Sequence, residues 1–555
     1  MTQMIQNPIL PGFNPDPSIV RVGDDYYIAT STFEWFPGVQ IHHSRDLRNW
    51  KLVTRPLTRA EQLDMRGDPD SGGVWAPDLS YSDGQFWLIY TDVKRRDGAW
   101  KDSHNYLVTA PAIEGPWSDA IYLNSSGFDP SLFHDEDGRK WLVNMIWDHN
   151  FGPAGDRFGG IVLQEYSVEE KRLTGPIRNI YRGTDHKFTE GPHLYRRDGW
   201  YYLLTAEGGT GYDHAVTMAR SRNLEGPYET DPAKHVLTAK DTLSHGLQRA
   251  GHASIVETQD GEFYMPHLCS RPLPETIDIA TGGATNIHAD DVRRSPLGRE
   301  TAIQKLVWPE GEFPRLAHGG CAPATEVEAP DLPEHPVDPL PTRTDFSGPD
   351  LPLPFQWLRS PEPKRLFSLT ERPGFLRLFG RESPGSAFEH ALVARRQTDF
   401  AYRAETEIDF APQDYQQFAG LISWYNRFKF HYLAVTANEA GERLLTINSC
   451  AADWPDARLD FPLKEPIRLP DDGPVRLGCD VDGAELRFRY ATGDTWQDLG
   501  LVLDQSAISD EAGNGPGNNF TGAFVGICAH DTSGRSTPAD FPYFTYEPAE
   551  TLRHG

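Results

Sequence analysis

The stretch Asp16-Pro17-Ser18-Ile19, which runs on to Tyr26-Tyr27, opens a pattern that recurs four more times in the first half of the chain. The other copies are Trp75-Ala76-Pro77-Asp78-Leu79 to Phe86-Trp87, Asp129-Pro130-Ser131-Leu132 to Trp141, Glu190-Gly191-Pro192-His193-Leu194 to Tyr201-Tyr202, and His252-Ala253-Ser254-Ile255 to Phe263-Tyr264. Between the two apolar runs of each copy stand Gly23-Asp24, Asp83-Gly84, Asp137-Gly138, Asp198-Gly199 or Asp260-Gly261. Such pairs favour two-residue hairpin turns because glycine tolerates positive φ. Each copy therefore predicts strand, turn, strand.

Hairpin repeats that begin about 60 residues apart are typical of a β-propeller, whose four-stranded blades surround a central axis. We predict a five-bladed propeller over residues 1–322, in which the five opening residues hold one equivalent position at the mouth of the channel. The openers are Asp16, Trp75, Asp129, Glu190 and His252. Three carboxylates facing one cavity repel one another, which raises the pKa of at least one. The alternative is that these acids only cap turns, but that need would recur in every copy and two copies lack an acid.

The second half of the chain predicts a separate domain. Prolines crowd residues 323–342, which predicts a stiff, extended linker. Beyond it, alternating apolar segments predict an antiparallel β-sandwich over residues 343–555, with strands at 402–410, 418–424, 430–436, 443–448, 475–481 and 486–490. This domain could bind carbohydrate or buttress the propeller, and the second interpretation is favoured because its aromatic residues form no obvious platform. Helical periodicity is almost absent, and one short helix is expected around Arg59 to Met65.

Composition excludes several classes of partner. A formal net charge of −27 argues against nucleic acid or an anionic membrane, both of which need a basic footprint. No segment is apolar for long enough to span a bilayer, and the N-terminus lacks the features of a signal peptide. The five cysteines show no paired spacing, which suits a reducing compartment. These features together predict a cytoplasmic protein.

Several short motifs carry a resemblance to a known family. They are Asn14-Pro15-Asp16-Pro17-Ser18, Ser31-Thr32-Phe33-Glu34-Trp35-Phe36-Pro37-Gly38-Val39, Gly73-Val74-Trp75-Ala76-Pro77, Gly127-Phe128-Asp129-Pro130-Ser131, Thr189-Glu190-Gly191-Pro192, Leu297-Gly298-Arg299-Glu300-Thr301 and Asn518-Asn519-Phe520-Thr521-Gly522-Ala523-Phe524. Over nearly its whole length the chain resembles glycoside hydrolase family 43, specifically its two-domain β-xylosidases. One departure is the stretch 274–293, which is longer than expected before the Arg299 motif and bears on the rim of the site.

The resemblance implies roles for the residues that match. Asp16 would be the general base that activates water, Glu190 the general acid that protonates the leaving oxygen, and Asp129 the carboxylate that positions the acid and keeps its pKa raised. Arg299 would bridge the base and the sugar hydroxyls. Trp75, Phe33 and Trp147 would form apolar walls against the sugar, although for Trp147 ordinary blade packing is an equal alternative. Phe520, on a loop of the second domain, would close the leaving-group subsite and restrict substrates to chain ends.

The role of His252 stays open, because a single histidine lining the channel can bond substrate, hold a central water or help to bind a divalent cation such as calcium. Apart from that cation, no metal or other cofactor is expected. The sequence does not decide the oligomeric state and is compatible with a homo-oligomer. The expected partners are xylo-oligosaccharides.

The resemblance implies an exo-acting, inverting hydrolase that releases xylose from the non-reducing end of β-1,4-xylo-oligosaccharides, with α-L-arabinofuranosidase activity as an added or main activity. Inversion is expected because Asp16 and Glu190 open the first and fourth repeats and should face each other across the channel with room for water. A retaining β-fructosidase is an alternative, but its Trp-x-Asn-Asp-Pro and Glu-Cys phrases are missing. A non-catalytic sugar-binding propeller is another, although it would not need three converging carboxylates.

Overall fold

A computed structural model describes residues 3–96, 98–150, 156–273, 293–452, 456–512 and 519–549. The chain folds into two compact units, each described here by itself. The first, the propeller unit, comprises Met1–Pro272 and Arg299–Val337; the second, the sandwich unit, comprises Asp338 onward together with Leu273 and the described residues 293–298. The long stretch expected at 274–293 lies outside the described residues except for Arg293.

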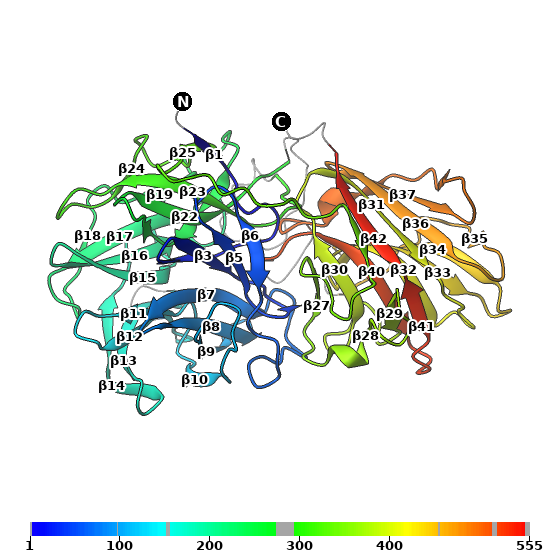
Figure 1. Ribbon diagram of the computed structural model, residues 1–555, viewed down its shortest axis with the longest axis horizontal. Helices are drawn as coiled ribbons and strands as arrows, with labels where there is room; N and C mark the ends of the chain where they lie inside the picture. Colours follow the sequence, from blue (N-terminus) through cyan, green and yellow to red (C-terminus); the bar gives the residue numbers. More distant parts are fainter. Residues whose placement is uncertain are drawn as a thin grey trace. The chain divides into compact units, whose positions relative to one another are not determined.

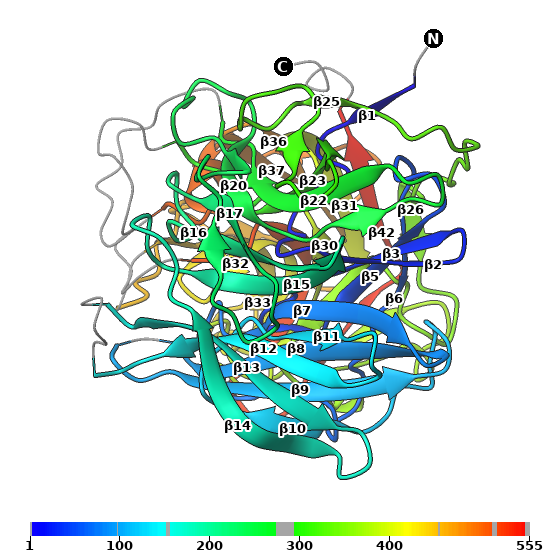
Figure 2. The same cartoon turned by 90° about the vertical axis from the view of Figure 1, so that its left-hand side faces the viewer.

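Five sheets in the described part of the propeller unit are each built on a path of four antiparallel strands (Figures 1 and 2). In order from the inside of the unit outward, they are β2 (Ser18–Val22), β3 (Asp25–Thr30), β5 (Gln40–Ser44), β6 (Lys51–Thr54); β7 (Gly73–Ser82), β8 (Gln85–Arg95), β9 (Asp102–Ala110), β10 (Ile121–Asn124); β11 (Ser131–His134), β12 (Lys140–Trp147), β13 (Phe158–Ser167), β14 (Arg172–Tyr181); β15 (Glu190–Arg197), β16 (Trp200–Glu207), β17 (Ala215–Ser221), β18 (Glu229–Thr230); and β20 (Gln248–Ala253), β22 (Phe263–Ser270), β23 (Glu300–Val307), β24 (Arg315–Leu316). Short strands β19 (Leu237–Thr238) and β21 (Val256–Glu257) pair with β17 and β22, and β4 (Trp35–Phe36) follows β3 in the chain. The predicted propeller is therefore confirmed, and we call these sheets blades 1 to 5.

Three of the five predicted hairpins have the expected two-residue turn. In blades 1, 2 and 4 the strands meet directly at residues 23–24, 83–84 and 198–199. Both turn residues of blades 2 and 4 have positive φ, as a type I′ turn requires. In blades 3 and 5 the prediction was wrong, because Asp137-Gly138 and Asp260-Gly261 lie within longer loops. A hydrogen bond from Asp135 N–H to Arg139 O closes the first loop, and one from Thr258 N–H to Glu262 O closes the second.

The five opening residues are not strictly equivalent. In each blade, the aromatic residue of the second strand pairs with a residue of the first strand. This partner lies four positions after the opener in blades 1, 3 and 5, but five positions after it in blades 2 and 4. The pairs, in that order of blades, are Tyr27–Val20, Trp141–Phe133, Tyr264–Val256, Trp87–Ser80 and Tyr202–Tyr195. In blades 2 and 4, the residues equivalent to Asp16, Asp129 and His252 are thus Ala76 and Gly191. All five of these residues have positive φ. The sequence alignment was one residue out for Trp75 and Glu190, because their strands carry a register irregularity directly after them.

Side chains two residues beyond these five positions connect the blades to one another. These side chains are Ser18, Asp78, Ser131, His193 and Ser254. Ser18 Oγ donates to Asp78 Oδ1 at 2.7 Å, and Ser131 Oγ donates to Pro192 O at 2.6 Å. Ser254 Oγ donates to Pro17 O at 2.8 Å and accepts from Ile19 N–H at 3.0 Å, so blade 5 is bonded to blade 1. The repeated phrase therefore holds the ring of blades together as well as carrying the acids.

The predicted domain boundary at residue 322 and the linker 323–342 need correction. Strand β25 (Glu326–Glu328) pairs antiparallel with β1 (Met4–Gln6), and Val327 is buried with Ile5 in the core of the propeller unit. Further along, His335 N–H donates to Asp46 Oδ2 at 2.8 Å. The proline-rich segment therefore belongs to the propeller unit as far as Val337. Proline prevents regular pairing but does not prevent packing, which composition alone could not distinguish.

The sandwich unit consists mainly of two antiparallel sheets, as predicted (Figure 1). One has the order β26 (Arg343–Asp345), β42 (Tyr543–Pro548), β31 (Ala401–Ile408), β36 (Val475–Asp482), β37 (Glu485–Ala491), β38 (Gln497–Asp498), with β39 (Leu503–Asp504) also on β37; the other contains β35 (Ile467–Arg468), β34 (Arg443–Ala451), β33 (Lys429–Ala437), β32 (Gln417–Asn426), β40 (Phe524–Asp531), β30 (Ala391–Arg396) and β27 (Phe355–Leu358). A small sheet joins β28 (Phe367–Ser368), β29 (Leu376–Phe379) and β41 (Pro538–Phe541). All six strands expected here are present.

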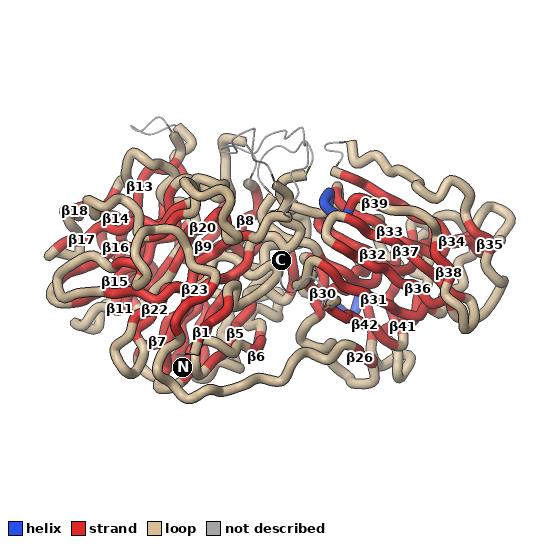
Figure 3. The backbone as a smooth tube through the Cα atoms, turned by 90° about the horizontal axis from the view of Figure 1, so that it is seen from above, coloured by secondary structure: helices blue, strands red, loops and turns tan. Residues whose placement is uncertain are grey.

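Helical structure is minimal among the described residues. The two 3₁₀ helices, η1 (Pro363–Arg365) and η2 (Gln505–Ala507), are the helical elements assigned there, and Figure 3 shows that strands and loops form both units. The helix expected at Arg59 to Met65 is absent: the Leu63 N–H bonds to Arg59 O, and the segment otherwise consists of turns. None of the described helices is long and apolar enough to cross a membrane.

Candidate active site

Three buried acids lie at the inner ends of blades 1, 3 and 4. Asp16 and Asp129 directly precede the Pro-Ser that leads into β2 and β11, and Glu190 is the first residue of β15. They are only 5%, 6% and 7% exposed, respectively. Asp16 and Asp129 adopt left-handed backbone conformations with φ of 55° and 54°. This conformation is costly for a residue other than glycine, and such strain is typically found at functional positions.

The surroundings of Asp16 favour its ionised form. Ser31 Oγ donates to Asp16 Oδ2 at 2.6 Å, and Arg299 Nη1 donates to Asp16 Oδ1 at 3.1 Å. Burial raises the pKa of Asp16, but Arg299, His252 and the Ser31 hydrogen bond together outweigh burial, so the pKa lies below its usual value. Because burial lowers the pKa of His252 itself to about 4, this imidazole is neutral at pH 7 and Arg299 is the cation that matters there.

Glu190 and Asp129 have the opposite electrostatics. Burial and then the negative charge of Asp16 raise the pKa of Glu190 to about 8, against the opposing influence of Arg299 and Lys101. The pKa of Asp129 is also raised well above its usual value, first by burial and then by Glu190 and Asp16. Gly191 N–H donates to Asp129 Oδ2 at 3.1 Å, so the residue after Glu190 ties the two acids together. One carboxylate is therefore ionised and another protonated at neutral pH, the division of roles that acid–base catalysis needs.

A chain of aromatic rings connects blades 1 to 3 near these acids. Phe33, Trp75, Phe128 and Trp147 follow one another with centroid separations of 6.0, 5.3 and 6.2 Å. The Lys101 ammonium lies over the Trp147 ring at 4.4 Å and over Trp75 at 5.4 Å. The predicted wall residues Phe33, Trp75 and Trp147 are thus brought together, and the Trp147 ring belongs to this chain rather than to a separate blade core.

Two histidines lie near Asp16. His252 Nδ1 is 3.7 Å from Asp16 Oδ1, and the His252 ring packs so closely on Gly191 that a Cβ there would lie 3.1 Å from it. His214 is fully buried against Gly251, and burial lowers its pKa to about 3. In the described part of the chain, no group of three or more His, Cys, Asp or Glu side chains is arranged to hold a metal ion.

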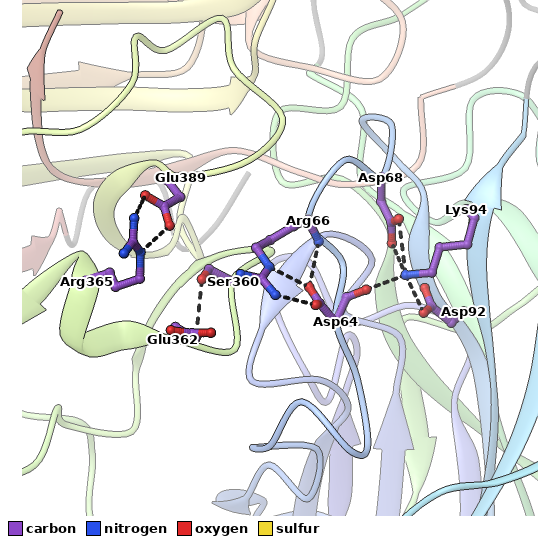
Figure 4. A network of polar contacts seen from close by, with 9 residues as sticks. All are labelled: Asp64, Arg66, Asp68, Asp92, Lys94, Ser360, Glu362, Arg365 and Glu389. Atoms are coloured by element: carbon purple, nitrogen blue, oxygen red, sulfur yellow. Dashed lines mark hydrogen bonds and ion pairs between the residues drawn. The ribbon is translucent and has the colours of Figure 1, made fainter. Parts of the chain in front are cut away.

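The Trp75 indole is bonded to a loop that a polar network holds, and Figure 4 shows Asp64, Asp68, Asp92 and Lys94 of this network. Trp75 Nε1–H donates to Ser71 O at 3.0 Å, and the loop before Ser71 is held by Lys94, which donates to Asp64 O. The Lys94 ammonium also lies 2.8 Å from Asp92 Oδ2 and 3.3 Å from Asp68 Oδ1. Burial and the charge of Asp92 raise the pKa of Asp68 to about 8. This loop thus contains a carboxyl outside the three catalytic candidates that holds a proton at neutral pH.

Asp68 predicts a pH dependence of stability. Its pKa of about 8 in the folded state lies above the value of about 3.9 for an unfolded chain. The folded state therefore binds more protons between these values, and the stability linked to that proton is lost as pH rises from about 4 to about 8. Asp68→Asn cannot ionise, so its melting temperature relative to that of wild type should increase from pH 5 to pH 8 and exceed the wild-type value at pH 8.

Asp64→Asn is the matched control on the same loop. Hydrogen bonds from Arg66 hold the pKa of Asp64 below its usual value, so Asp64 is ionised throughout this interval. Its replacement should change the melting temperature by the same amount at pH 5 and pH 8. A melting temperature of Asp68→Asn at pH 8 that does not exceed that of wild type would contradict the assignment of the proton to Asp68.

Phe520 lies in the sandwich unit, on a loop held by buried polar groups. Thr521 N–H donates to Tyr425 Oη at 3.0 Å, and Tyr425 Oη–H donates to Asp510 Oδ1. Lys429 Nζ donates to Ser509 O at 2.6 Å. The loop base is therefore firmly fixed within its own unit. That Phe520 closes a leaving-group subsite stays a prediction.

Sequence reasoning missed Lys101, Phe128 and His214. Phe128 could have been found, because it directly precedes Asp129 in a quoted motif. Lys101 and His214 carry no local signal: each lies in a connecting segment, and only folding brings it near residues of other blades.

The centre of the propeller combines an ionised carboxylate, protonated carboxyl groups and a wall of aromatic rings. These are the groups that a glycoside hydrolase uses for acid–base catalysis and sugar binding. Comparison with known proteins agrees. Residues 5–314 match the glycosyl hydrolases family 43, and residues 343–547 match the beta xylosidase C-terminal concanavalin A-like domain. The chain belongs to glycosyl hydrolase family 43.

Individual relatives match nearly the whole chain. A xylosidase/arabinosidase 43B of Humicola insolens is 55% identical over 98% of this chain and 98% of its own length. A beta-xylosidase of Bacillus subtilis (strain 168) is 50% identical over 98% of this chain and 99% of its own length. The crystal structure of a xylan beta-1,4-xylosidase from Bacillus halodurans C-125 superposes with a TM-score of 0.92 at 52% identity, covering 98% of this chain and 100% of that one.

Proposed function

We propose that this protein is an exo-acting, inverting β-xylosidase that releases xylose from the non-reducing end of β-1,4-xylo-oligosaccharides. The observation that carries the proposal is the opposite displacement of two pKa values at one centre, downward for Asp16 and upward to about 8 for Glu190. The names of the relatives in Humicola insolens, Bacillus subtilis and Bacillus halodurans support the choice of xylosides.

In this proposal Asp16 is the general base. Arg299 and Ser31 hold its carboxylate in place and keep it ionised, so that it can accept a proton from the attacking water. Arg299 also lies against the Phe33 ring, with its guanidinium carbon 5.3 Å from the ring centroid, which leaves this cation fixed between the base and the aromatic wall. From that position Arg299 is suited to orient sugar hydroxyls next to Asp16.

Glu190 is the general acid in the same proposal. Its raised pKa keeps it protonated at neutral pH, so it can deliver a proton to the leaving oxygen as the glycosidic bond breaks. Asp129 acts through Glu190 as a positioning residue: it accepts from Gly191 N–H, and burial and the charge of Glu190 raise its own pKa, so the two carboxyls resist ionising together. His252 is neutral and is suited to hydrogen bonding with substrate rather than to ion pairing.

The stereochemistry tests the proposal directly. In a single displacement, water attacks the face of the sugar opposite the leaving group, so a β-xyloside should release α-xylose as the first product. Proton NMR of the anomeric signals during the first minutes of xylobiose hydrolysis would show this. Initial release of β-xylose would mean a double displacement with Asp16 as nucleophile, and no release of xylose would remove the proposed function. Sucrose, run in parallel, tests the β-fructosidase alternative.

α-L-Arabinofuranosidase activity is the second candidate. The Humicola insolens relative is named for both activities, and the two sugars present similar hydroxyls to one site. Comparing an aryl α-L-arabinofuranoside with the aryl β-xyloside gives the ratio of the two activities.

A further inference from the structure

Trp100 is a large aromatic side chain in solvent beside the candidate site. It is 59% exposed, and it is the one tryptophan among the large apolar residues exposed in the described parts of the chain. One face of its indole is stacked on the His149 imidazole, with centroids 4.2 Å apart and planes 29° apart. The exposed area therefore lies on the opposite face and the edges of the ring. The free face of this indole is open to a ligand that can stack on an aromatic ring.

The Trp100–His149 pair is continuous with the aromatic wall of the site. Trp147 Nε1–H donates to Ala99 O at 3.0 Å, so the loop carrying Trp100 is bonded to a wall residue. On the other side of Trp100, Lys101 places its ammonium over the rings of Trp147, Trp75 and Phe128. His149 follows Trp147 two residues later. The Trp100–His149 pair, which we call the platform, thus directly adjoins the end of the aromatic wall at Trp147.

The platform lies on the side of the proton donor. Arg299 and then Lys101 lower the pKa of Glu190, and Lys101 is not among the groups that shift the pKa of Asp16. Because Glu190 in the proposed function protonates the leaving oxygen, groups next to Lys101 face the leaving group and whatever sugar follows it. An exo-acting enzyme has no sugar beyond the cleaved unit on the other side, so an added binding surface is useful only here.

We propose that Trp100, stacked on His149, forms a distal subsite that binds the xylosyl unit following the leaving-group sugar in substrates of three or more units. This inference rests on the proposed function. The C–H face of a xylopyranose packs on the free indole face, and His149 keeps the indole from turning. The binding energy acts on xylotriose and longer chains, while xylobiose ends before it reaches the platform.

The experiment is to measure kcat/KM for xylobiose, xylotriose and xylotetraose. Wild type should prefer xylotriose to xylobiose. Trp100→Ala should lower kcat/KM for the two longer substrates by roughly 3- to 10-fold, in line with the energy of one aromatic contact, and leave xylobiose unchanged. Trp100→Phe, which keeps a ring, should recover part of the loss, and His149→Ala should reproduce a smaller loss.

Tyr122→Ala is the matched control, because Tyr122 is 54% exposed and lies on β10, at the outer edge of blade 2. It should leave all three values unchanged. Losses for Trp100→Ala that are equal at every chain length, or absent at every chain length, would overturn the subsite. A change of oligomeric state on gel filtration with no chain-length effect would overturn it in favour of contact with a second copy. Failure of wild type to cleave xylobiose would instead count against the proposed function.

Discussion

Asp16→Asn is expected to lower kcat by about 10²- to 10⁴-fold, and to do so equally for xylobiose and for an aryl β-xyloside. An amide cannot take a proton from the attacking water, and this step is needed whatever the leaving group. Asn also presents one oxygen in place of two, so it cannot accept from both Ser31 and Arg299 as the carboxylate does. The kinetics of the two substrates, measured side by side, check this.

Ser31→Ala provides a graded control for the same residue. It removes the hydrogen bond to Asp16 Oδ2 but leaves Arg299 in place, so it should raise the pKa of Asp16. The acid limb of the pH profile for kcat/KM should then move to higher pH, with activity kept at the optimum. Substantial activity of Asp16→Asn on xylobiose would assign water activation to another group.

Glu190→Gln is expected to separate the two substrates. The alkoxide leaving group of xylobiose needs a proton, whereas a phenolate leaves unaided. The variant should therefore lose about 10²- to 10⁴-fold on xylobiose and far less on an aryl xyloside with a good leaving group. Equal losses on the two substrates would remove Glu190 from the role of acid.

The pH profile gives an independent test of Glu190. With a pKa of about 8, the wild-type acid loses its proton as pH rises through that value, and kcat/KM for xylobiose should fall there. Because Asp129 and Glu190 are coupled, the measured limb belongs to the pair rather than to one residue. Glu190→Gln cannot ionise, so its remaining activity on xylobiose should lack this limb. A limb that persists in the variant would assign it to a different group.

Much of the architecture followed from local patterns in the sequence. A hairpin with an Asp-Gly turn can be recognised from about a dozen residues, because the turn residues and the alternation of apolar side chains both indicate two paired strands. Their recurrence led to the propeller, and the alternating segments beyond residue 400 led to six strands that the structure contains. The acids Asp16, Asp129 and Glu190 could be identified as candidates because each opens a copy of the repeated phrase. Comparing the copies showed which of them begin with an acid and which do not.

The tertiary structure decided the registers and the electrostatics. The phrase could not show that Gly191, not Glu190, is the equivalent of Asp16, because an irregularity of one residue in a strand leaves no mark in the spacing of aromatic residues. Nor could it assign 323–337 to the propeller unit, since proline content predicts stiffness and not where a segment packs. Both depend on partners that are distant in the chain.

What the sequence by itself determined is therefore the kind of fold and the identity of the acids. Which acid is ionised and which is protonated was decided only by folding. Arg299 reaches Asp16 from far along the chain, while Glu190 and Asp129 are buried together near that same negative charge. The pKa of a carboxyl depends on burial and on charges within a few ångströms, and these distances exist only once the blades have closed into a ring.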